Sequence, residues 1–493
     1  MKSPIRMMFA FVFAVCALLA AATQASASRD QTTILQDDAQ LLGSDDSRRN
    51  QMLDEWKTLG VDIVKVRLDW RDTAPATKPA DPTDPAAYDP IDWALYDAVV
   101  RGARQRGMDV YLMLGGHAPA WASEPSPKGL PTGVHRPDPA LFGQFVQAVG
   151  KRYSGSYTPT NGDYFDPNPL PRVTIWSVWN EPNLVSWLSP QADAPEIYRK
   201  LLYAGFDGLS ASGHASDTLL YGEFVPFGAS KGKRRRPLEF LREVACVNSR
   251  YRAYTGSNAR KRGCNNFRAL PGTGVAHHPY TFAGGPSVKM PNRDEVSIGQ
   301  LSRMTSALDT LTRKKRFAAS GKQALWSTEF GIQSDPPDPV QTPIKKVPEY
   351  LGQAEWIAFK NPRVSAWSQY PFTDDPVAKS GPNRHAGFQS GIRFENGREK
   401  PGVYHAFRFP FYVRRLSGSK VEVFGGVRGA AQGAQVTIES RSSRRGKWTR
   451  LAALTTGAQG YFDRNFNVSN AATREFRFQW QAEKSRIAAA AKR

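Results

Sequence analysis

The sequence predicts an α/β fold, a (β/α)8 TIM barrel followed by a small C-terminal all-β sandwich. The first indication is a repeated order in which a helix-like segment ends in a glycine and an apolar, strand-like segment follows. Apolar residues recur at helical spacing over 52–59 before Gly60, and residues 61–67 have a strand-like composition. The same order returns over 93–107 and 108–114. The second indication is that short alternating segments replace this order near the C-terminus.

Eight strand-like segments precede that change. They lie near residues 32–36, 61–68, 108–114, 173–179, 217–223, 273–278, 323–328 and 363–369. Apolar strands that alternate with helices imply a parallel sheet covered by helices, and eight such units fit a barrel. A doubly wound open sheet is the alternative, but no glycine-rich phosphate loop follows any of these strands. We therefore expect a barrel domain over residues 30–410.

The remaining segment has the pattern of an all-β module. Short alternating strands, such as 421–424, 434–438 and 476–480, are separated by turns rich in Gly, Ser and Arg. A β-sandwich accessory domain over residues 411–487 is expected. It contains no cluster of catalytic residue types, so a packing or spacer role and a role in carbohydrate or cell-wall binding both remain open.

Residues 1–27 have the composition of a secretory signal peptide. Lys2 and Arg6 precede an apolar stretch, and small residues at 25–27 provide a cleavage site. The alternative is a membrane anchor, for which the uncharged stretch is short. We expect a secreted protein, extracellular or periplasmic, with no membrane span. In an oxidising compartment Cys246 and Cys264 are expected to form a disulfide, the alternative being two free thiols.

Two of the predicted strands end in a glutamate. The β-branched and aromatic run 173–179 is followed by Asn180, Glu181 and Pro182, and the run 323–328 is followed by Glu329. The C-terminal ends of the strands of a parallel barrel meet at one face, where active sites lie. Both carboxylates therefore belong on the same rim. Cleavage of a glycosidic bond requires such a pair, with one carboxyl group as acid and the other as nucleophile or as base for water.

The segment Ile-Trp-Ser-Val-Trp-Asn-Glu-Pro-Asn at 175–183 resembles the fourth-strand motif of clan A (4/7 superfamily) retaining glycoside hydrolases. Residues 326–331, Trp-Ser-Thr-Glu-Phe-Gly, are similar to their seventh-strand nucleophile segment. Further points of similarity are Arg67, the His-Pro-Tyr run at 278–280 and Trp367, and Pro-Ala-Trp at 119–121 resembles families 39 and 5 in particular. The resemblance covers roughly residues 30–400.

This resemblance implies a role for each carboxylate. Glu181 is expected to be the acid/base and Glu329 the nucleophile of a double displacement. Arg67 and Tyr280 resemble the groups that hold such a nucleophile in place. For Arg67 the alternative is a structural ion pair with Asp69 or another rim acid.

The other expected site residues bind the substrate. The resemblance assigns Asn180 to the sugar 2-hydroxyl and Trp367 to a sugar platform, with a core aromatic as the alternative for Trp367. His278 is expected to be a hydrogen-bonding residue of the rim rather than a metal ligand, and His117 is a candidate for lining the cleft. No metal and no cofactor are expected.

Glu223, at the end of the fifth strand, is a third carboxylate on the same rim. It competes with Glu181 and Glu329 for either catalytic role, but the preceding residue is a glycine and not an asparagine. We therefore interpret Glu223 as a residue that contacts substrate or supports the site.

The chain is strongly basic, with a formal net charge of +21. From Gly402 onward there are 17 Lys and Arg against 5 Asp and Glu, so the β module is the most basic part. Such a surface favours polyanions, and for an exported protein an acidic or cell-wall glycan fits better than nucleic acid, which we do not expect as a partner. The basic run 231–236 follows the fifth strand on the reactive face and is either a contact for an acidic sugar chain or a solvated loop.

Two functions from different classes follow. The first is a secreted, monomeric retaining glycoside hydrolase. The second is a catalytically idle barrel that binds polysaccharide and is anchored by its β module. A pure binder has no need of an acid and a nucleophile together, so the sequence favours the enzyme.

Overall fold

The computed structural model describes residues 30–88, 90–159, 168–229, 232–281, 284–381, 383–430 and 432–491. The predicted signal peptide lies outside these residues. Within the described part of the chain, no helix combines the length and apolar composition that a bilayer crossing requires.

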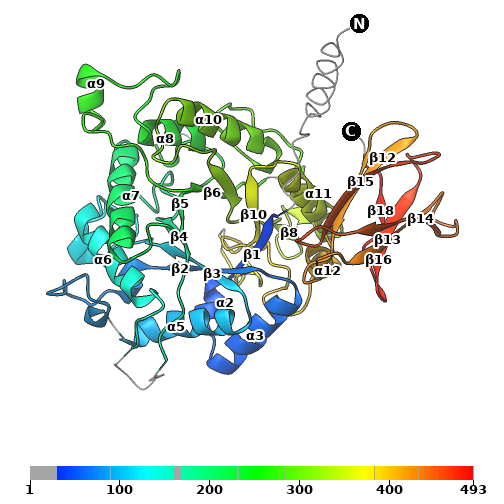
Figure 1. The fold of residues 1–493 in the computed structure, drawn as a ribbon, viewed down its shortest axis with the longest axis horizontal. Helices are drawn as coiled ribbons and strands as arrows, with labels where there is room; N and C mark the ends of the chain where they lie inside the picture. The colour runs from blue at the N-terminus through cyan, green and yellow to red at the C-terminus, as the bar shows by residue number, and fades with distance from the viewer. Residues whose placement is uncertain are drawn as a thin grey trace, which may run out of the picture.

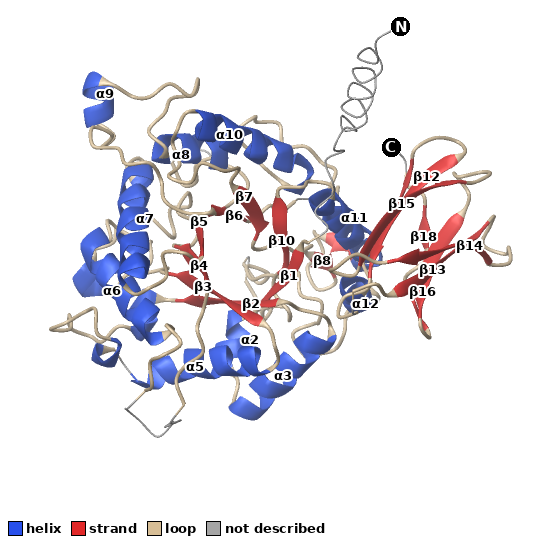
Figure 2. Ribbon diagram, in the orientation of Figure 1, coloured by secondary structure: helices blue, strands red, loops and turns tan. Residues whose placement is uncertain are grey.

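Eight parallel strands close into a barrel in the order β1-β10-β7-β6-β5-β4-β3-β2 (Figures 1 and 2). They are β1 (Thr32–Gln36), β2 (Ile63–Leu68), β3 (Asp109–Leu114), β4 (Ile175–Val178), β5 (Thr218–Phe224), β6 (Gly274–His277), β7 (Ala324–Ser327) and β10 (Val364–Gln369). Each predicted strand is present, with ends that differ from the prediction by at most two residues. The predicted fold class is confirmed.

Helices surround this barrel on its outer face (Figure 2). The α-helices of the described residues are α2 (Asp38–Gly43), α3 (Asp46–Thr58), α4 (Trp70–Thr73), α5 (Pro90–Gln105), α6 (Pro139–Arg152), α7 (Ala194–Ala211), α8 (Pro237–Val244), α9 (Gly256–Arg260), α10 (Leu301–Arg313), α11 (Val347–Phe359) and α12 (Val403–Arg408). Those that surround the barrel include α3, α5, α6, α7, α10 and α11, whereas α9 lies farther out (Figure 2). A short parallel pair, β8 (Ser334–Asp335) and β9 (Thr342–Pro343), lies in the connection after β7. Several helices begin where an aspartate caps free backbone N–H groups, as Asp45 does for α3 and Asp138 for α6.

The interior of the barrel is filled by one layer of apolar side chains. This layer comprises Ile34, Ile63, Tyr111, Ile175, Leu220, Ala276 and Ala366, with Trp326 packed against it. Several of the next inward-facing positions toward the C-terminal ends of the strands are polar, among them Lys65, Ser177 and Thr328, and all three are fully buried. The barrel is therefore closed by an apolar layer on which a largely polar layer rests.

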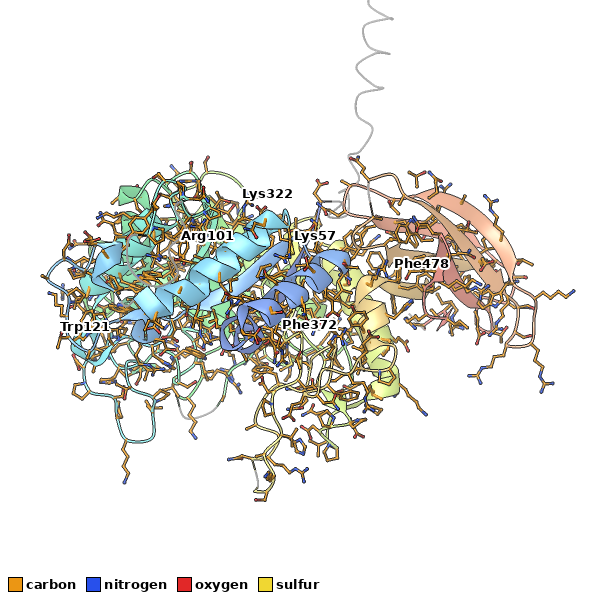
Figure 3. The ribbon with its side chains drawn as sticks, turned by 90° about the horizontal axis from the view of Figure 1, so that it is seen from below. Lys57, Arg101, Trp121, Lys322, Phe372 and Phe478 are labelled. Carbon is orange, nitrogen blue, oxygen red and sulfur yellow. A yellow bond between two sulfur atoms is a disulfide. The ribbon has the colours of Figure 1, made fainter. Side chains whose placement is uncertain are left out.

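The C-terminal strands form two antiparallel sheets. One has the order β11-β12-β15, with β11 (Phe411–Arg415), β12 (Lys420–Gly426) and β15 (Tyr461–Asn467). The other has the order β14-β13-β16-β17 with β18 paired to β16, where β13 is Gln435–Arg441, β14 Thr449–Thr455, β16 Glu475–Trp480, β17 Glu483–Lys484 and β18 Ala488–Ala489. These sheets share an apolar core that includes Phe478, separate from the barrel core that includes Phe372 (Figure 3).

The β module is joined to the barrel through a buried charge. Arg428 donates from Nε to Thr33 Oγ1 at 3.1 Å and also contacts Glu355 of α11, to which Tyr461 donates at 2.6 Å. Phe359 at the end of α11 packs against Phe424 of the module. Thr33 lies near the start of β1, so this junction is away from the rim formed by the strand C-terminal ends.

Cys246 and Cys264 form a disulfide, as the sequence predicted. The bond closes a loop between β5 and β6 with a sequence separation of 18. In the chain-entropy model, a disulfide that closes a loop of this size stabilises the folded protein by about 3 kcal/mol, because it restricts the unfolded chain. We therefore expect thiol labelling of the unfolded, unreduced protein to find no free Cys246 or Cys264. Replacing both residues with Ser should lower the unfolding midpoint, and an unchanged midpoint would mean that the closed loop does not stabilise the folded state.

Candidate active site

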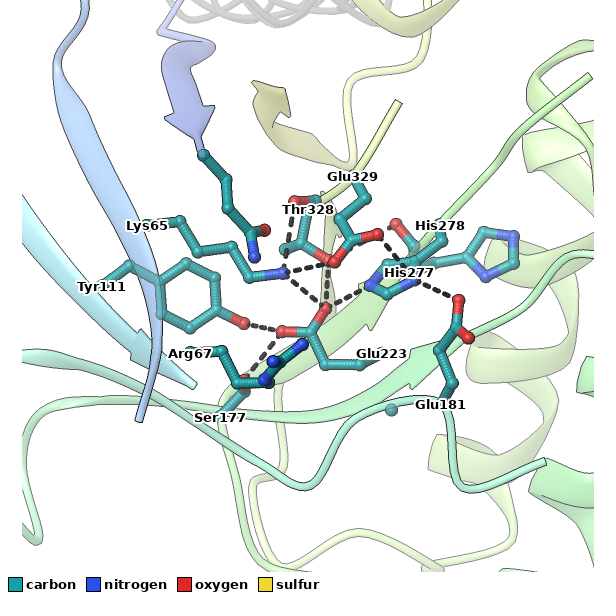
Figure 4. Close-up of polar contacts among 12 residues, drawn as sticks. Lys65, Arg67, Tyr111, Ser177, Glu181, Glu223, His277, His278, Thr328 and Glu329 are labelled. Carbon is teal, nitrogen blue, oxygen red and sulfur yellow. Dashed lines mark hydrogen bonds and ion pairs between the residues drawn. The ribbon is translucent and has the colours of Figure 1, made fainter. Parts of the chain in front are cut away.

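The two predicted catalytic glutamates meet at the C-terminal rim of the barrel. Glu181 follows β4 and Glu329 follows β7, and β5 and β6 lie between these two strands in the barrel. One oxygen of each carboxylate and one nitrogen of His278 all lie within 4.8 Å of one another (Figure 4). The Glu181 side chain is 14% exposed and that of Glu329 9%, so both carboxylates are largely withdrawn from water.

The chain that carries Glu181 is strained. Trp179 has φ +66° and Glu181 has φ +39°, a region of backbone conformation that L-residues rarely adopt. Trp179 is held there because its buried ring packs against Phe142 and its Nε1 donates to Trp187 O at 2.9 Å. Such conformations persist only where the surrounding structure enforces them, and they cluster at functional sites.

His278 lies between the carboxylates. Its Nδ1 is 3.0 Å from Glu181 Oε1 and 3.4 Å from Glu329 Oε2, and its Nε2 is 2.7 Å from Glu223 Oε2. Burial alone would lower the pKa of His278, but the surrounding carboxylates raise it to about 9. His278 is thus a hydrogen-bonding residue at the centre of the site.

Glu223 is fully buried beneath the pair. Besides His278, its carboxylate accepts hydrogen bonds from Tyr111, from Ser177 at 2.7 Å and from Thr328 at 2.5 Å, and Lys65 Nζ lies 3.1 Å away. Despite complete burial, Lys65 and these donors hold the pKa of Glu223 below its usual range. Of the two interpretations left open by the sequence, this placement matches a supporting residue.

Glu223 reaches this position through a β-bulge. The register between β5 and β6 shifts between Gly222 and Phe224, and Glu223 at the shift has φ +51°. A bulge re-aims the side chain of its extra residue, here into the barrel. The bulge also holds the backbone of Glu181 directly, because the N–H of Glu181 donates to Glu223 O at 3.1 Å.

Glu329 is held by Tyr280 and Lys65. Tyr280 donates to Glu329 Oε2 at 3.0 Å, as the resemblance implied, and Lys65 Nζ lies 3.5 Å from Oε1.

The expected place of Arg67 beside Glu329 needs correction. Its Nε lies 3.5 Å from Asp69, the alternative named above, and its guanidinium stacks over Trp187. The reason is that Lys65, two residues earlier on the same face of β2, is deeper in the barrel and reaches the carboxylates.

The remaining predicted residues lie around the pair. Asn180 is 5% exposed, and its Oδ1 has no hydrogen-bond partner in the described part of the chain. His117 stacks on Trp187 at 4.9 Å, so a layered group of His117, Trp187 and Arg67 borders the rim. Trp367 is 2% exposed and packs on Phe330, which matches the alternative of a core aromatic rather than an open sugar platform.

Lys65 and Trp187 are functional candidates that the sequence analysis missed. A lysine within the apolar run 63–66 was the available signal, because a buried strand accepts a charge only where a partner compensates it. Trp187 lies in the loop after β4 and has no sequence pattern that separates it from other surface aromatics.

Glu181, His278 and Glu329 also have the spacing of a possible metal site. Both ring nitrogens of His278 face carboxylate oxygens, so its contact with Glu181 or with Glu223 would have to be broken for either nitrogen to bind a cation.

Comparison with models of known protein families finds no match, and neither does comparison with curated proteins. Solved structures with a similar arrangement include a β-glucuronidase of Bacteroides uniformis (11% identity, TM-score 0.44), an exo-β-1,4-mannosidase from Opitutaceae bacterium strain TAV5 (15%, 0.41) and a family 44 xyloglucanase of Paenibacillus polymyxa (12%, 0.38). The alignment with the glucuronidase covers 94% of this chain and 46% of that protein. For the mannosidase the two values are 78% and 60%, and for the xyloglucanase they are 90% and 95%. The chain thus spans less than half of the glucuronidase. The similarity is one of overall arrangement only.

The surroundings of Glu181 determine the pH at which its carboxyl group loses its proton. Burial raises its pKa above the ordinary 4.5, and Glu329 adds to the effect, while His278 opposes it. A group that acts as an acid works while protonated, so kcat/KM on a substrate with a poor leaving group should fall as pH rises through this raised pKa. We expect the midpoint of that alkaline limb above 4.5 in a pH profile. A Glu181→Ala variant assayed with an activated aryl glycoside should lack the limb, and a limb that persists would assign it to another group.

Proposed function

We propose that this protein is a secreted retaining glycoside hydrolase, with Glu181 as acid/base and Glu329 as nucleophile. The observation that carries the proposal is the approach of these two carboxylates on the barrel rim, with oxygens within 4.8 Å. Retaining enzymes have carboxyl groups about 5–5.5 Å apart, whereas inverting enzymes need about 6.5–9.5 Å to admit a water molecule. Their different surroundings support different roles, because Glu329 contacts Lys65 and a tyrosine hydroxyl whereas burial raises the pKa of Glu181.

The reaction then proceeds in two displacements. Glu329 attacks the anomeric carbon while Glu181 gives its proton to the leaving oxygen, and the C–O bond breaks to leave a glycosyl–Glu329 ester. Glu181, now a carboxylate, takes a proton from water, whose oxygen attacks the same carbon and releases Glu329. Lys65 and Tyr280 hold Glu329 in place for both steps.

Variants of the two glutamates test these roles. Glu329→Gln should abolish turnover on every glycoside, because no nucleophile remains. Glu181→Ala should lose about 10²–10⁴-fold on substrates that need a proton and much less on activated aryl glycosides. Azide should rescue Glu181→Ala and give a glycosyl azide of retained configuration, detected by NMR.

The controls for this experiment are stereochemical. The first-formed anomer from the wild-type protein should have the configuration of the substrate. An inverted first product contradicts retention. A glycosyl azide of retained configuration from a Glu329→Ala variant would reverse the two assignments, because azide would then have attacked a glycosyl ester formed on another carboxylate. A wild-type protein that binds glycans but hydrolyses none of a broad panel would instead be the idle, polysaccharide-binding barrel.

We further propose that the substrate is an anionic glycan, with Arg234 as the contact. Lys231 lies outside the described residues. Of the arginines in this basic loop, Arg235 pairs with Glu239 at 2.8 Å and Arg236 lies within 4 Å of Glu239 and Glu295. Arg234 stacks on Phe227, and its backbone bridges to Leu184, just after Glu181. Burial lowers the pKa of Arg234, and the negative charge of Glu181 opposes this effect. This placement supports a short-range contact with a substrate anion better than long-range steering by the whole loop.

Charge removal separates these two possibilities. Arg234→Gln should lower kcat/KM about 10- to 100-fold on a uronate-containing polymer, the loss of a charged hydrogen bond, and leave its carboxyl-reduced form unaffected. Arg235→Gln removes the same charge from a paired residue and is the matched control. Equal effects of both variants, reduced by salt, would indicate steering, and no effect of either would indicate a neutral substrate.

A further inference from the structure

The buried layer beneath the catalytic pair contains two charged groups, Glu223 and His278, that have no step of their own in the double displacement. Lys65, Glu223 and His278 are all fully buried, and each is in contact with at least one other member. Charges buried at this depth are costly unless they are paired, and a bulge with a left-handed residue is needed to direct Glu223 inward. The layer therefore calls for a functional explanation.

Together with the pair above it, this layer is electrically balanced when Glu181 is protonated. Lys65 and doubly protonated His278 are the cations, and Glu223 and Glu329 are the anions. Three titratable neighbours of this layer are neutral, because burial lowers the pKa of His277, adjacent to His278, to about 4 and raises the pKa of Tyr280 and of Tyr111, which contacts Glu223, well above the usual range. Without Glu223 the same layer carries an uncompensated positive charge.

The ring geometry gives this balance a chemical consequence. With Nε2–H directed to Glu223, a doubly protonated His278 donates its Nδ1–H to Glu181 Oε1 at 3.0 Å. An oxygen that accepts this hydrogen bond cannot point its own proton along the same line. The acid proton of Glu181 is therefore expected on Oε2, the oxygen that does not accept from His278.

We propose that Glu223 is a positioning residue that keeps His278 doubly protonated, and that His278 thereby determines which oxygen of Glu181 carries the catalytic proton. This inference rests on the proposed function of Glu181. In a neutral His278, Nδ1 has a lone pair that accepts the Glu181 proton. The acid is then turned away from its substrate while Glu329 remains in place.

The first test measures the charge of His278 and does not depend on turnover. In ¹⁵N spectra of the wild-type protein, the imidazole signals that disappear in His278→Gln should show two protonated nitrogens at pH 8. In Glu223→Gln the same ring should lose a proton at a pH lower by about 1 to 3 units, the usual effect of a nearby opposite charge. A neutral His278 in the wild-type protein at pH 7 would overturn the inference, even if Glu223→Gln does not fold.

The second test measures dependence on the leaving group. Across aryl glycosides of rising aglycone pKa, kcat/KM of Glu223→Gln should fall progressively further below the wild type, up to about 10²-fold, because only poor leaving groups need the proton. Ser177→Ala removes a neutral donor from the same carboxylate and should keep the wild-type slope. Glu223→Asp retains the negative charge and should therefore recover part of the kcat/KM that Glu223→Gln loses on poor leaving groups.

The outcomes separate this inference from the proposed function. An equal loss of Glu223→Gln activity on all aryl glycosides would mean that Glu223 is only structural. Azide rescue of Glu223→Ala would mean that Glu223 touches the substrate, which also overturns the positioning role. If the wild-type protein hydrolyses no glycoside, the proposed function fails, and the spectra still report the charge of His278.

Discussion

The active face of this protein depends on one fully buried carboxylate, that of Glu223. Its surroundings provide Lys65, His278 and three hydroxyl donors, which come from β2, β3, β4 and the ends of β6 and β7, so that five other barrel strands converge on one group. A buried charge that loses its partner destabilises a protein by about 3–5 kcal/mol. The positions of Lys65 and His278, and through them of Glu329 and Glu181, are therefore set by the requirement to compensate this charge.

The backbone contributes to the same arrangement. The bulge at Glu223 turns its side chain inward, and the carbonyl of the same residue accepts from the N–H of Glu181. Two left-handed residues, Glu181 and Glu223, are thus tied to each other across neighbouring strands. The hydrogen bond between them helps to hold both residues in their left-handed conformation. Both lie above the apolar layer that fills the barrel.

The β module is connected to a different part of the barrel. Its buried link through Arg428 and Glu355 joins α11 and the start of β1, so the module braces the fold at a distance from the rim. Its excess of basic residues consequently lies away from the rim that carries Glu181 and Glu329. In the loop after β5, by contrast, two of the arginines have acidic neighbours, which shows how a run of like charges in the sequence divides into paired and unpaired residues once the chain folds.

Much of this protein was determined by local pattern. The barrel, its eight strands, the all-β C-terminal segment and the disulfide follow from periodicity, turn residues and cysteine count, because these reflect short-range backbone preferences and the burial of one face. That Glu181 and Glu329 meet also follows, since the C-terminal ends of parallel strands share a rim. Only the tertiary structure decided that Lys65 rather than Arg67 contacts Glu329, that Trp367 is covered, and that Glu223 lies beneath the pair. Which cation reaches which carboxylate depends on side-chain depth, on one bulge and on distances across the barrel, and none of these is encoded in residues adjacent in the chain.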